Sequence, residues 1–223
     1  IKLPYFRFPG FQNIERNDVV VFNFPLDIEN PVDKRENYIK RCVGLPGDQF
    51  QIIDRQIVVN EQKQNFPKEG QFEYFVNTKD SHLSQDQIAT LNITDGGPIQ
   101  SDTGYVGKYA LTSETLQKIK ALPNVISVEE IQRPKGLSLI EEPVFPEDPR
   151  HYPWNLDNYG PLPIPAAGQT VTLDTANIAI YRDLIEQYEG NEIKQIGTDF
   201  TINGVATNQY TFKMNYYFMM GDN

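Results

Sequence analysis

Turn-forming residues recur along this chain too often for long helices or long central strands. Its 223 residues include 16 prolines and 15 glycines. Proline is excluded from the interior of helices and central strands, and glycine weakens both, so we expect short elements joined by turns. We therefore predict a mainly β fold, with an antiparallel β core interrupted by a mixed α+β insert, rather than a helical bundle.

The composition excludes several classes of function. A formal net charge of −10 repels phosphate groups, so we do not expect a nucleic-acid partner. Cys42 is the single cysteine, so neither an internal disulfide nor a cysteine metal cluster can form. His82 and His151 are the two histidines, which poorly supply a zinc site or a Ser-His-Asp triad. We expect no metal and no other cofactor.

The first residues of the sequence resemble the middle of a protein. No apolar run reaches the roughly 18 residues of a membrane-spanning helix. The chain begins at Ile1 without an initiator methionine or a secretory leader. We interpret it as part of a longer protein.

Runs of β-branched and aromatic residues predict strands near both ends. The run 19–24 reads as a buried strand ended by Pro25. The dipeptide Asn203–Gly204 is the strongest hairpin signal in the chain. The predicted strands are 19–24, 38–43, 51–53, 56–59, 125–131, 200–202, 205–210 and 216–220, with a turn at 54–55.

Three helices and an irregular segment are predicted between these strands. Ser84 and Gln87 fit a capping box, and Thr112 is suited to cap a helix over 113–122. The clearest helix is 175–189, with Asp174 as its N-cap and Gly190 as its stop. The proline-rich stretch 141–168 is expected to be an irregular connector, partly polyproline II. We predict a β core from residues 1–62 and 200–223, interrupted by an inserted mixed domain over 63–199.

Lys40 is the most unusual residue of the predicted strands, because it lies inside an otherwise apolar run. Side chains alternate between the two faces of a strand, so Tyr38, Lys40 and Cys42 would share one face. An ammonium on a partly buried face is unfavourable unless it is paired or loses its proton, and a neutral lysine can act as a general base. On the residues alone, an edge-strand lysine that faces water is the more ordinary interpretation.

The sequence around Lys40 favours the general base over the lysine that faces water. Residues 37–48 read NYIKRCVGLPGD, and this stretch closely resembles the lysine-bearing motif of bacterial type I signal peptidases, the Ser/Lys dyad family. Residues 16–22 (RNDVVVF) resemble the preceding motif of that family, and residues 217–223 (YFMMGDN) resemble the opening of its last motif. Asn60 falls where the family often has an Asn-Gly turn. The long insert is similar to versions found in some Gram-negative bacteria.

The resemblance implies a role for each matching residue. Lys40 would be the general base that activates a serine. Tyr38 and Ile39 would lie on the strand that pairs with an extended substrate peptide. The residues that support the site would be Arg41, Gly221, Asp222 and Asn223.

Three departures from the family pattern are visible. The family's nucleophilic serine lies upstream of its lysine, yet no Ser or Thr precedes Thr78 here. We therefore expect the serine and its anchor helix before Ile1, and no activity from this chain alone. Asn17 replaces a usual glycine, which Asn can do because it tolerates left-handed backbone geometry. The last motif breaks off after Asn223.

The resemblance also implies a mechanism and a place in the cell. A free lysine has a pKa of about 10.4, whereas a base that works near neutral pH needs about 7–8, which burial can provide. The enzyme would cleave the signal peptides of exported preproteins, bound by strand addition, at sites flanked by small side chains. It would be held in the bacterial inner membrane and face the periplasm.

The aromatic side chains near the N-terminus have two possible uses. Tyr5, Phe6, Phe8 and Phe11 would either dip into the bilayer interface or pack in the core.

The sequence also allows other interpretations. Residues 102–104 (DTG) match the aspartic protease tripeptide, but no second copy exists for a single-chain dyad, so a polar turn is favoured. Cys42 is expected to be a small buried residue rather than a reactive thiol. The chain could instead be a non-catalytic homologue, a secreted binding module, or another Ser/Lys peptidase such as a self-cleaving repressor.

Overall fold

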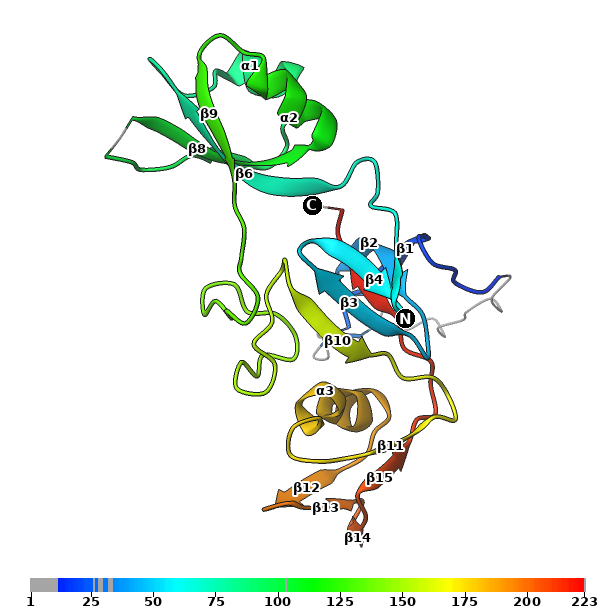
Figure 1. Cartoon of the computed structure of the whole chain (residues 1–223). Coiled ribbons are helices and arrows are strands. Elements are labelled where there is room, and N and C mark those ends of the chain that lie inside the picture. The colour runs from blue at the N-terminus through cyan, green and yellow to red at the C-terminus, as the bar shows by residue number, and fades with distance from the viewer. Residues whose placement is uncertain (1–11, 26, 28–29, 32–33, 103, 223) are drawn as a thin grey trace.

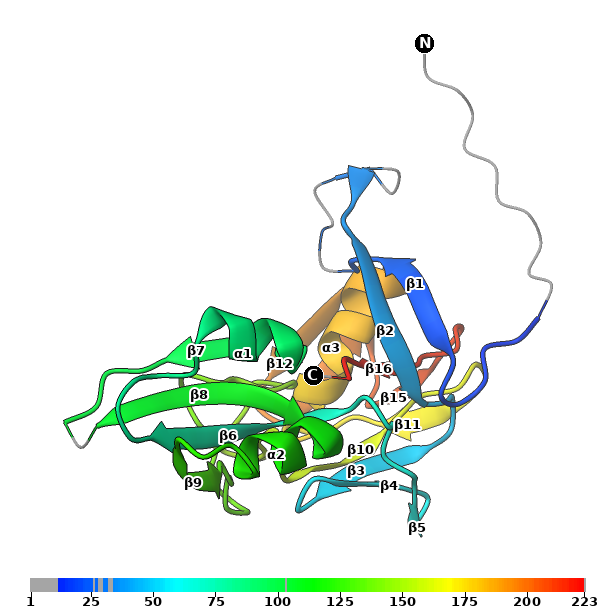
Figure 2. The same ribbon diagram turned by 90° about the horizontal axis from the view of Figure 1, so that it is seen from above.

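The computed structural model describes residues 12–222 except 26, 28–29, 32–33 and 103. The N-terminal aromatic residues, Thr103 and Asn223 therefore lie outside the described residues. The fold is mainly β, as predicted, and is built from small antiparallel sheets (Figures 1 and 2). Short elements dominate because prolines and glycines interrupt the chain so often.

The first sheet joins the two ends of the sequence. Its strands are β1 (Val19–Asn23), β2 (Asn37–Gly44) and β16 (Phe218–Met220), in the order β1-β2-β16. All pairs are antiparallel, and Val20 lies opposite Lys40 across β1 and β2. The predicted strand at 38–43 is confirmed as the middle strand, and the predicted strand at 216–220 is confirmed over 218–220.

The expectation that the strand over 19–24 is buried was wrong. Val19 is 56% exposed and Val21 is 65% exposed. The β-branched run does form a strand, but β1 lies at the edge of its sheet and no described segment covers its outer face. Strand propensity does not say how many faces of a strand are covered.

The second sheet lies next to the first. It contains β3 (Gln49–Ile53), β4 (Gln56–Val59), β5 (Gln62–Lys63) and β10 (Tyr159–Pro163), in the order β10-β3-β4-β5. The predicted turn between β3 and β4 is confirmed, with φ of 46° at Asp54 and 67° at Arg55. Asn60 and Glu61 form a similar turn, with φ of 50° and 65°.

Strand β10 corrects the expectation that 141–168 is wholly irregular. It includes Pro161 and Pro163, yet it pairs with β3. Proline is tolerated there because β10 is at the edge of the sheet, where it pairs on one side only.

The third sheet forms one end of the molecule in Figure 1. Strands β7 (Gly96–Pro98), β8 (Tyr105–Thr112), β6 (Gln71–Thr78) and β9 (Val125–Glu130) follow each other in that order. Helices α1 (Gln85–Thr90) and α2 (Ser113–Lys120) accompany it. Both predicted caps are confirmed: Ser84 and Gln87 form the capping box, and the Thr112 side chain accepts a hydrogen bond from the Thr115 N–H.

The opposite end of the molecule holds the remaining helix and two small sheets. Strand β11 (Thr170–Thr172) pairs with β15 (Gln209–Thr211), and β13 (Asp199–Ile202) lies between β12 (Ile193–Ile196) and β14 (Val205–Ala206). The hairpin at Asn203–Gly204 is confirmed, with φ of 52° and 80°.

The predicted helix over 175–189 needs correction at both ends. Helix α3 (Ile178–Asp183) begins later than expected, and the chain continues as a π-helical turn, Leu184–Tyr188. The Asp174 carboxylate accepts hydrogen bonds from the N–H groups of Ala176 and Asn177, so it stabilises a turn before the helix instead of capping it.

Two hydrophobic clusters stabilise the fold. One combines buried residues from 43–59 with others from 154–212, including Phe50, Tyr159 and Phe212. The other lies between the third sheet and its helices and includes Val76, Leu111 and Ile119. The division into a core of 1–62 and 200–223 and an insert of 63–199 stays a prediction, and residues 154–193 pack in the first cluster.

Gly160 offers a test of the pairing between β10 and β3. Its φ is +87°, and a Cβ placed there would lie 2.5 Å from the backbone oxygen of Phe50. We expect Gly160→Ala to lower the free energy of unfolding by at least ~2 kcal/mol, because a backbone clash adds to the strain. The measurement is urea unfolding followed by the fluorescence of Trp154, which is buried.

Gly168 is the matched control for this change. Its φ is +83°, but a Cβ there would meet nothing within 4 Å. Gly168→Ala should lower the free energy of unfolding by about 1 kcal/mol, because it adds backbone strain without a clash. Equal losses in the two variants would show that the contact with β3 is not tight.

Candidate functional site

Lys40 lies half-buried in the middle of the first sheet. Its Nζ is 6.0 Å from the centroid of the Tyr38 ring. Within the described part of the chain, this ammonium has no ion pair or hydrogen bond, whereas Arg16, Arg41, Arg55 and Arg133 are all paired. Among the described residues, the Lys40 ammonium therefore remains available to a further group.

The neighbours of Lys40 on β2 divide between the two faces, as predicted. The Tyr38 ring stacks on Phe24 with a centroid distance of 4.5 Å, and Phe22 lies 6.5 Å away. Ile39 points to the other face and is 65% exposed.

One edge of β2 is only partly covered. Strand β16 pairs with residues 41–44 of β2, while β1 pairs with residues 37–41 on the opposite edge. Among the described residues, the backbone of 37–40 therefore has a strand partner on one side only. An open strand edge can accept an extended peptide.

Arg41 connects this strand to the C-terminal segment. Its Nε donates to Oδ1 of Asp222 at 2.8 Å, and its Nη2 donates to Oδ2 at 2.6 Å. Its Nη1 also donates to the backbone oxygen of Asn17 at 2.8 Å. The hydrogen bonds from Arg41 hold the pKa of the Asp222 carboxyl below its usual value, and Asp222 raises the pKa of Arg41. Of the predicted supporting residues, Arg41 and Asp222 thus meet directly.

The Asn17 turn supports the same strand. Asn17 has a φ of 74°, so it adopts the left-handed geometry expected of a glycine substitute. Its N–H donates to the backbone oxygen of Cys42 at 2.7 Å. The turn before β1 is therefore bonded to the strand that carries Lys40.

A second ion pair, whose carboxylate is buried, was not predicted from the sequence. Arg16 donates through Nη2 to Oδ2 of Asp48 at 2.8 Å and through Nη1 to the backbone oxygen of Val43 at 2.8 Å. Asp48 is 8% exposed, and it also accepts from the Leu45 N–H and the Asn60 side chain. The signal was present, since Arg16, Asp48 and Asn60 all belong to the quoted motifs, but their contact depends on the fold.

Cys42 is a buried residue of this strand. Its exposure is 0%, and its Sγ lies 3.6 Å from the backbone oxygen of Gly44. Burial raises the pKa of this thiol. A thiol that is both inaccessible and protonated is a poor nucleophile.

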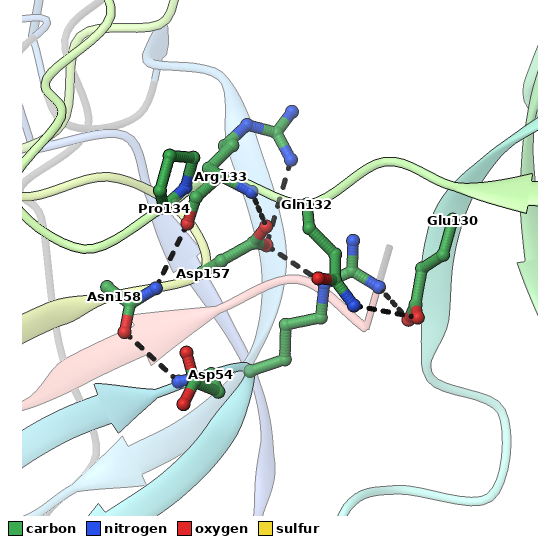
Figure 3. Close-up of a pocket in the computed structure, with 8 residues that line it drawn as sticks. Asp54, Glu130, Gln132, Arg133, Pro134, Asp157 and Asn158 are labelled. Carbon is green, nitrogen blue, oxygen red and sulfur yellow. Dashed lines mark hydrogen bonds and ion pairs between the residues drawn. The ribbon is translucent and has the colours of Figure 1, made fainter.

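A cavity of about 640 Å³ lies away from Lys40, where β9 leaves the third sheet (Figure 3). Its charged groups pair with each other: Arg55 contacts Glu130 and Asp157, and Arg133 contacts Asp157. Because the charges of these residues are mutually compensated, we interpret this cavity as structural rather than catalytic.

The described residues contain no group of three or more His, Cys, Asp or Glu side chains placed to hold a metal ion. Among those same residues, no helix is long and apolar enough to cross a membrane.

Comparison with known proteins shows the family of the chain. The model of the signal peptidase, peptidase S26 family matches residues 4–116, which include the whole of β1 and β2. The chain belongs to this family.

Individual relatives match a shorter stretch. The signal peptidase I proteins of Rickettsia typhi and Rickettsia prowazekii are each 47% identical over 49 residues. That of Rickettsia rickettsii is 45% identical over the same length. The match covers 22% of this chain and 16% of each relative. No solved structure matches the chain significantly.

The pair of Arg41 and Asp222 predicts a pH-dependent stability. The pKa of Asp222 is lowered in the folded protein, so the stabilisation is present above its unfolded value, about 3.9, and is lost as pH falls through the folded value. We expect Asp222→Asn to lower the free energy of unfolding by ~1 kcal/mol at neutral pH, because the pair is partly screened by water. The difference from wild type should shrink as the pH falls from neutral through the lowered pKa of Asp222.

Glu192→Gln is the control, since Glu192 forms an exposed pair with Lys194 at 3.0 Å. It should change stability by less than about 0.5 kcal/mol at neutral or acidic pH. A loss for Asp222→Asn that persists unchanged in acid would contradict the charge explanation.

Burial of Cys42 predicts slow thiol chemistry. In the folded chain, its reaction with a disulfide reagent near pH 8 should be about 100-fold slower than in urea. The rate of thiolate release measures this directly. Equal rates in the two conditions would mean that the first sheet opens readily.

Proposed function

We propose that this chain is the extracytoplasmic part of a serine endopeptidase that removes N-terminal signal peptides from exported proteins. Lys40 would act as the general base of a Ser/Lys dyad. One observation carries the proposal: a half-buried lysine without a described ion partner lies on the stretch of β2 that is open on one edge. Membership of the signal peptidase family supports it.

The open edge suggests how a substrate would bind. An extended peptide would add to residues 37–40 of β2 and continue the sheet beyond the point where β16 pairs. Tyr38 and Ile39 would supply the backbone groups for that pairing. The scissile peptide bond would then lie next to Lys40.

Lys40 would carry the proton transfers. Its neutral Nζ would take the proton from a serine Oγ while that oxygen attacks the scissile carbonyl carbon. The resulting ammonium would return the proton to the leaving amine as the peptide bond breaks. Water would then release the acyl group by the same steps. The sequence has no serine before Ser81, so the nucleophile would come from sequence upstream of Ile1.

The groups around Lys40 would keep its strand in place. Arg41 and Asp222 join β2 to the C-terminal segment, and Gly221 and Asn223 would extend that support. A bound apolar peptide would remove the remaining water from the lysine.

The cellular setting follows from the same proposal. An anchor helix upstream of Ile1 would hold the enzyme in the bacterial inner membrane, with the catalytic part facing the periplasm. The partners would be exported preproteins, and no cofactor or nucleic acid would take part.

Lys40 provides the direct test, made in the complete gene product with a signal-peptide substrate. Lys40→Ala should lower kcat by at least ~100-fold because the base is lost. Lys40→Arg should lower kcat by a similar factor, because arginine keeps the charge but does not lose its proton. Lys63 is an exposed lysine on β5, and Lys63→Arg serves as the control with unchanged cleavage.

Near-normal cleavage by either Lys40 variant would remove Lys40 from the mechanism. No cleavage by the wild-type gene product would favour a non-catalytic homologue instead.

A further inference from the structure

A backbone hydrogen bond joins the third sheet to the C-terminal segment. The N–H of Gln71, the first residue of β6, donates to the backbone oxygen of Asp222 at 2.8 Å. Figures 1 and 2 both show the C-terminal end beside the beginning of β6. The carboxylate of the same Asp222 holds Arg41, which neighbours Lys40 on β2. Strand β6 is therefore bonded to a residue that supports the lysine strand.

A buried arginine fixes β6 two residues further along. Arg133 is 7% exposed. Its Nη2 donates to Oε2 of Glu73 on β6 at 2.5 Å, and its Nε donates to Oε2 of Glu142 at 2.5 Å. Its backbone N–H donates to Oδ2 of Asp157 at 2.7 Å. Arg133 thus ties β6 to two segments of the proline-rich connector.

The same group of charges reaches the second sheet. Arg55, in the turn between β3 and β4, pairs with Asp157 and with Glu130, and its guanidinium lies 4.8 Å from the centroid of the Phe72 ring. Figure 3 shows Glu130, Arg133 and Asp157 converging at this place. We call this group the charged junction. Its members are Arg55, Glu73, Glu130, Arg133, Glu142 and Asp157.

Hydrogen bonds and ion pairs matter here because the apolar packing between the second and third sheets is incomplete. A cavity of about 340 Å³ lies between the second and third sheets. Its walls include Gln71, Phe72 and Glu73 from β6 together with Gly221 and Asp222. Where packing leaves such a space, the position of β6 relative to Asp222 depends on hydrogen bonds and ion pairs.

The lowered pKa of Glu73 is consistent with its ion pair to Arg133. Burial alone would raise the pKa of Glu73, but hydrogen bonds from Lys108 and Arg133 outweigh it and hold the pKa below its usual value. Glu73 is therefore a carboxylate at neutral pH, and the tie from β6 to Arg133 is charged.

We propose that the charged junction positions the lysine strand: Arg133 and Glu73 hold β6 so that Gln71 fixes Asp222, and Asp222 in turn fixes Arg41 beside Lys40. Arg133 and Glu73 are thus positioning residues for the peptidase reaction. This inference rests on the proposed function, which it extends to the third sheet.

The first test measures position without activity. Glu73→Gln removes the charge on β6 and leaves Arg133 paired with Glu142 and Asp157; Arg133→Met is the stronger variant. Amide hydrogen exchange in this chain should become about tenfold faster at Gln71 and at residues 218–222 in both variants. Amides of Phe50 and Ile57 in β3 and β4 should keep their wild-type rates.

Glu114→Gln is the matched control. It makes the same chemical change in an exposed pair with Lys118 (2.7 Å) on α2, beside the same sheet. It should leave every one of these amides unchanged. Wild-type exchange at 218–222 in Glu73→Gln, or equal acceleration at Phe50 and Ile57, would overturn the proposal.

The second test measures cleavage in the complete gene product. Glu73→Gln should lower kcat about fivefold and change KM less than about twofold, because the substrate still finds the open edge of β2 while the base is misplaced. Arg133→Lys should retain more activity than Arg133→Met, since lysine keeps the charge. An unchanged kcat in Glu73→Gln together with faster exchange would also overturn the proposal. If the wild-type gene product does not cleave, the proposed function fails, while the exchange rates still decide whether the junction fixes Asp222.

Discussion

The pair between Arg41 and Asp222 is the contact on which the arrangement around Lys40 depends. It joins residues that are 181 positions apart in the sequence. Two hydrogen bonds in a fork geometry fix the distance and the orientation of β2 relative to the segment that follows β16. The pairing of β16 with β2 brings the C-terminal segment to Arg41, and the pair then holds this segment beside the lysine.

The incomplete edge of β2 gives this sheet its functional interest. An open strand edge is usually a liability, because it invites unwanted pairing with other chains. Here the open stretch is limited to 37–40 by the point at which β16 begins to pair. The same lysine-bearing stretch lies within the part of the chain that matches the signal peptidase family. The proposed peptide binding rests on this open edge of four residues, one of which is Lys40.

The family match and the hydrophobic core cover different parts of the chain. The match ends at residue 116, whereas the first hydrophobic cluster draws many of its residues from 154–212. Tyr159 and Phe218, for example, both pack against Phe50. The sheets near Lys40 are therefore packed against segments that lie outside the matched residues 4–116, and the charged junction connects some of these segments to the third sheet.

Local features were determined by the sequence alone. The hairpin at Asn203–Gly204 and the capping box of Ser84 and Gln87 depend on neighbours a few residues away, so the residues predict them. The alternation that places Lys40 and Ile39 on opposite faces of a strand is equally local.

Burial and long-range pairing were decided by the tertiary structure. The exposure of β1, the strand inside the proline-rich stretch and the late start of α3 depend on which segments pack nearby. The pair of Arg16 and Asp48 and the bond from Gln71 to Asp222 join residues far apart in sequence. No local pattern encodes such contacts, because they exist only once the chain has brought distant segments together.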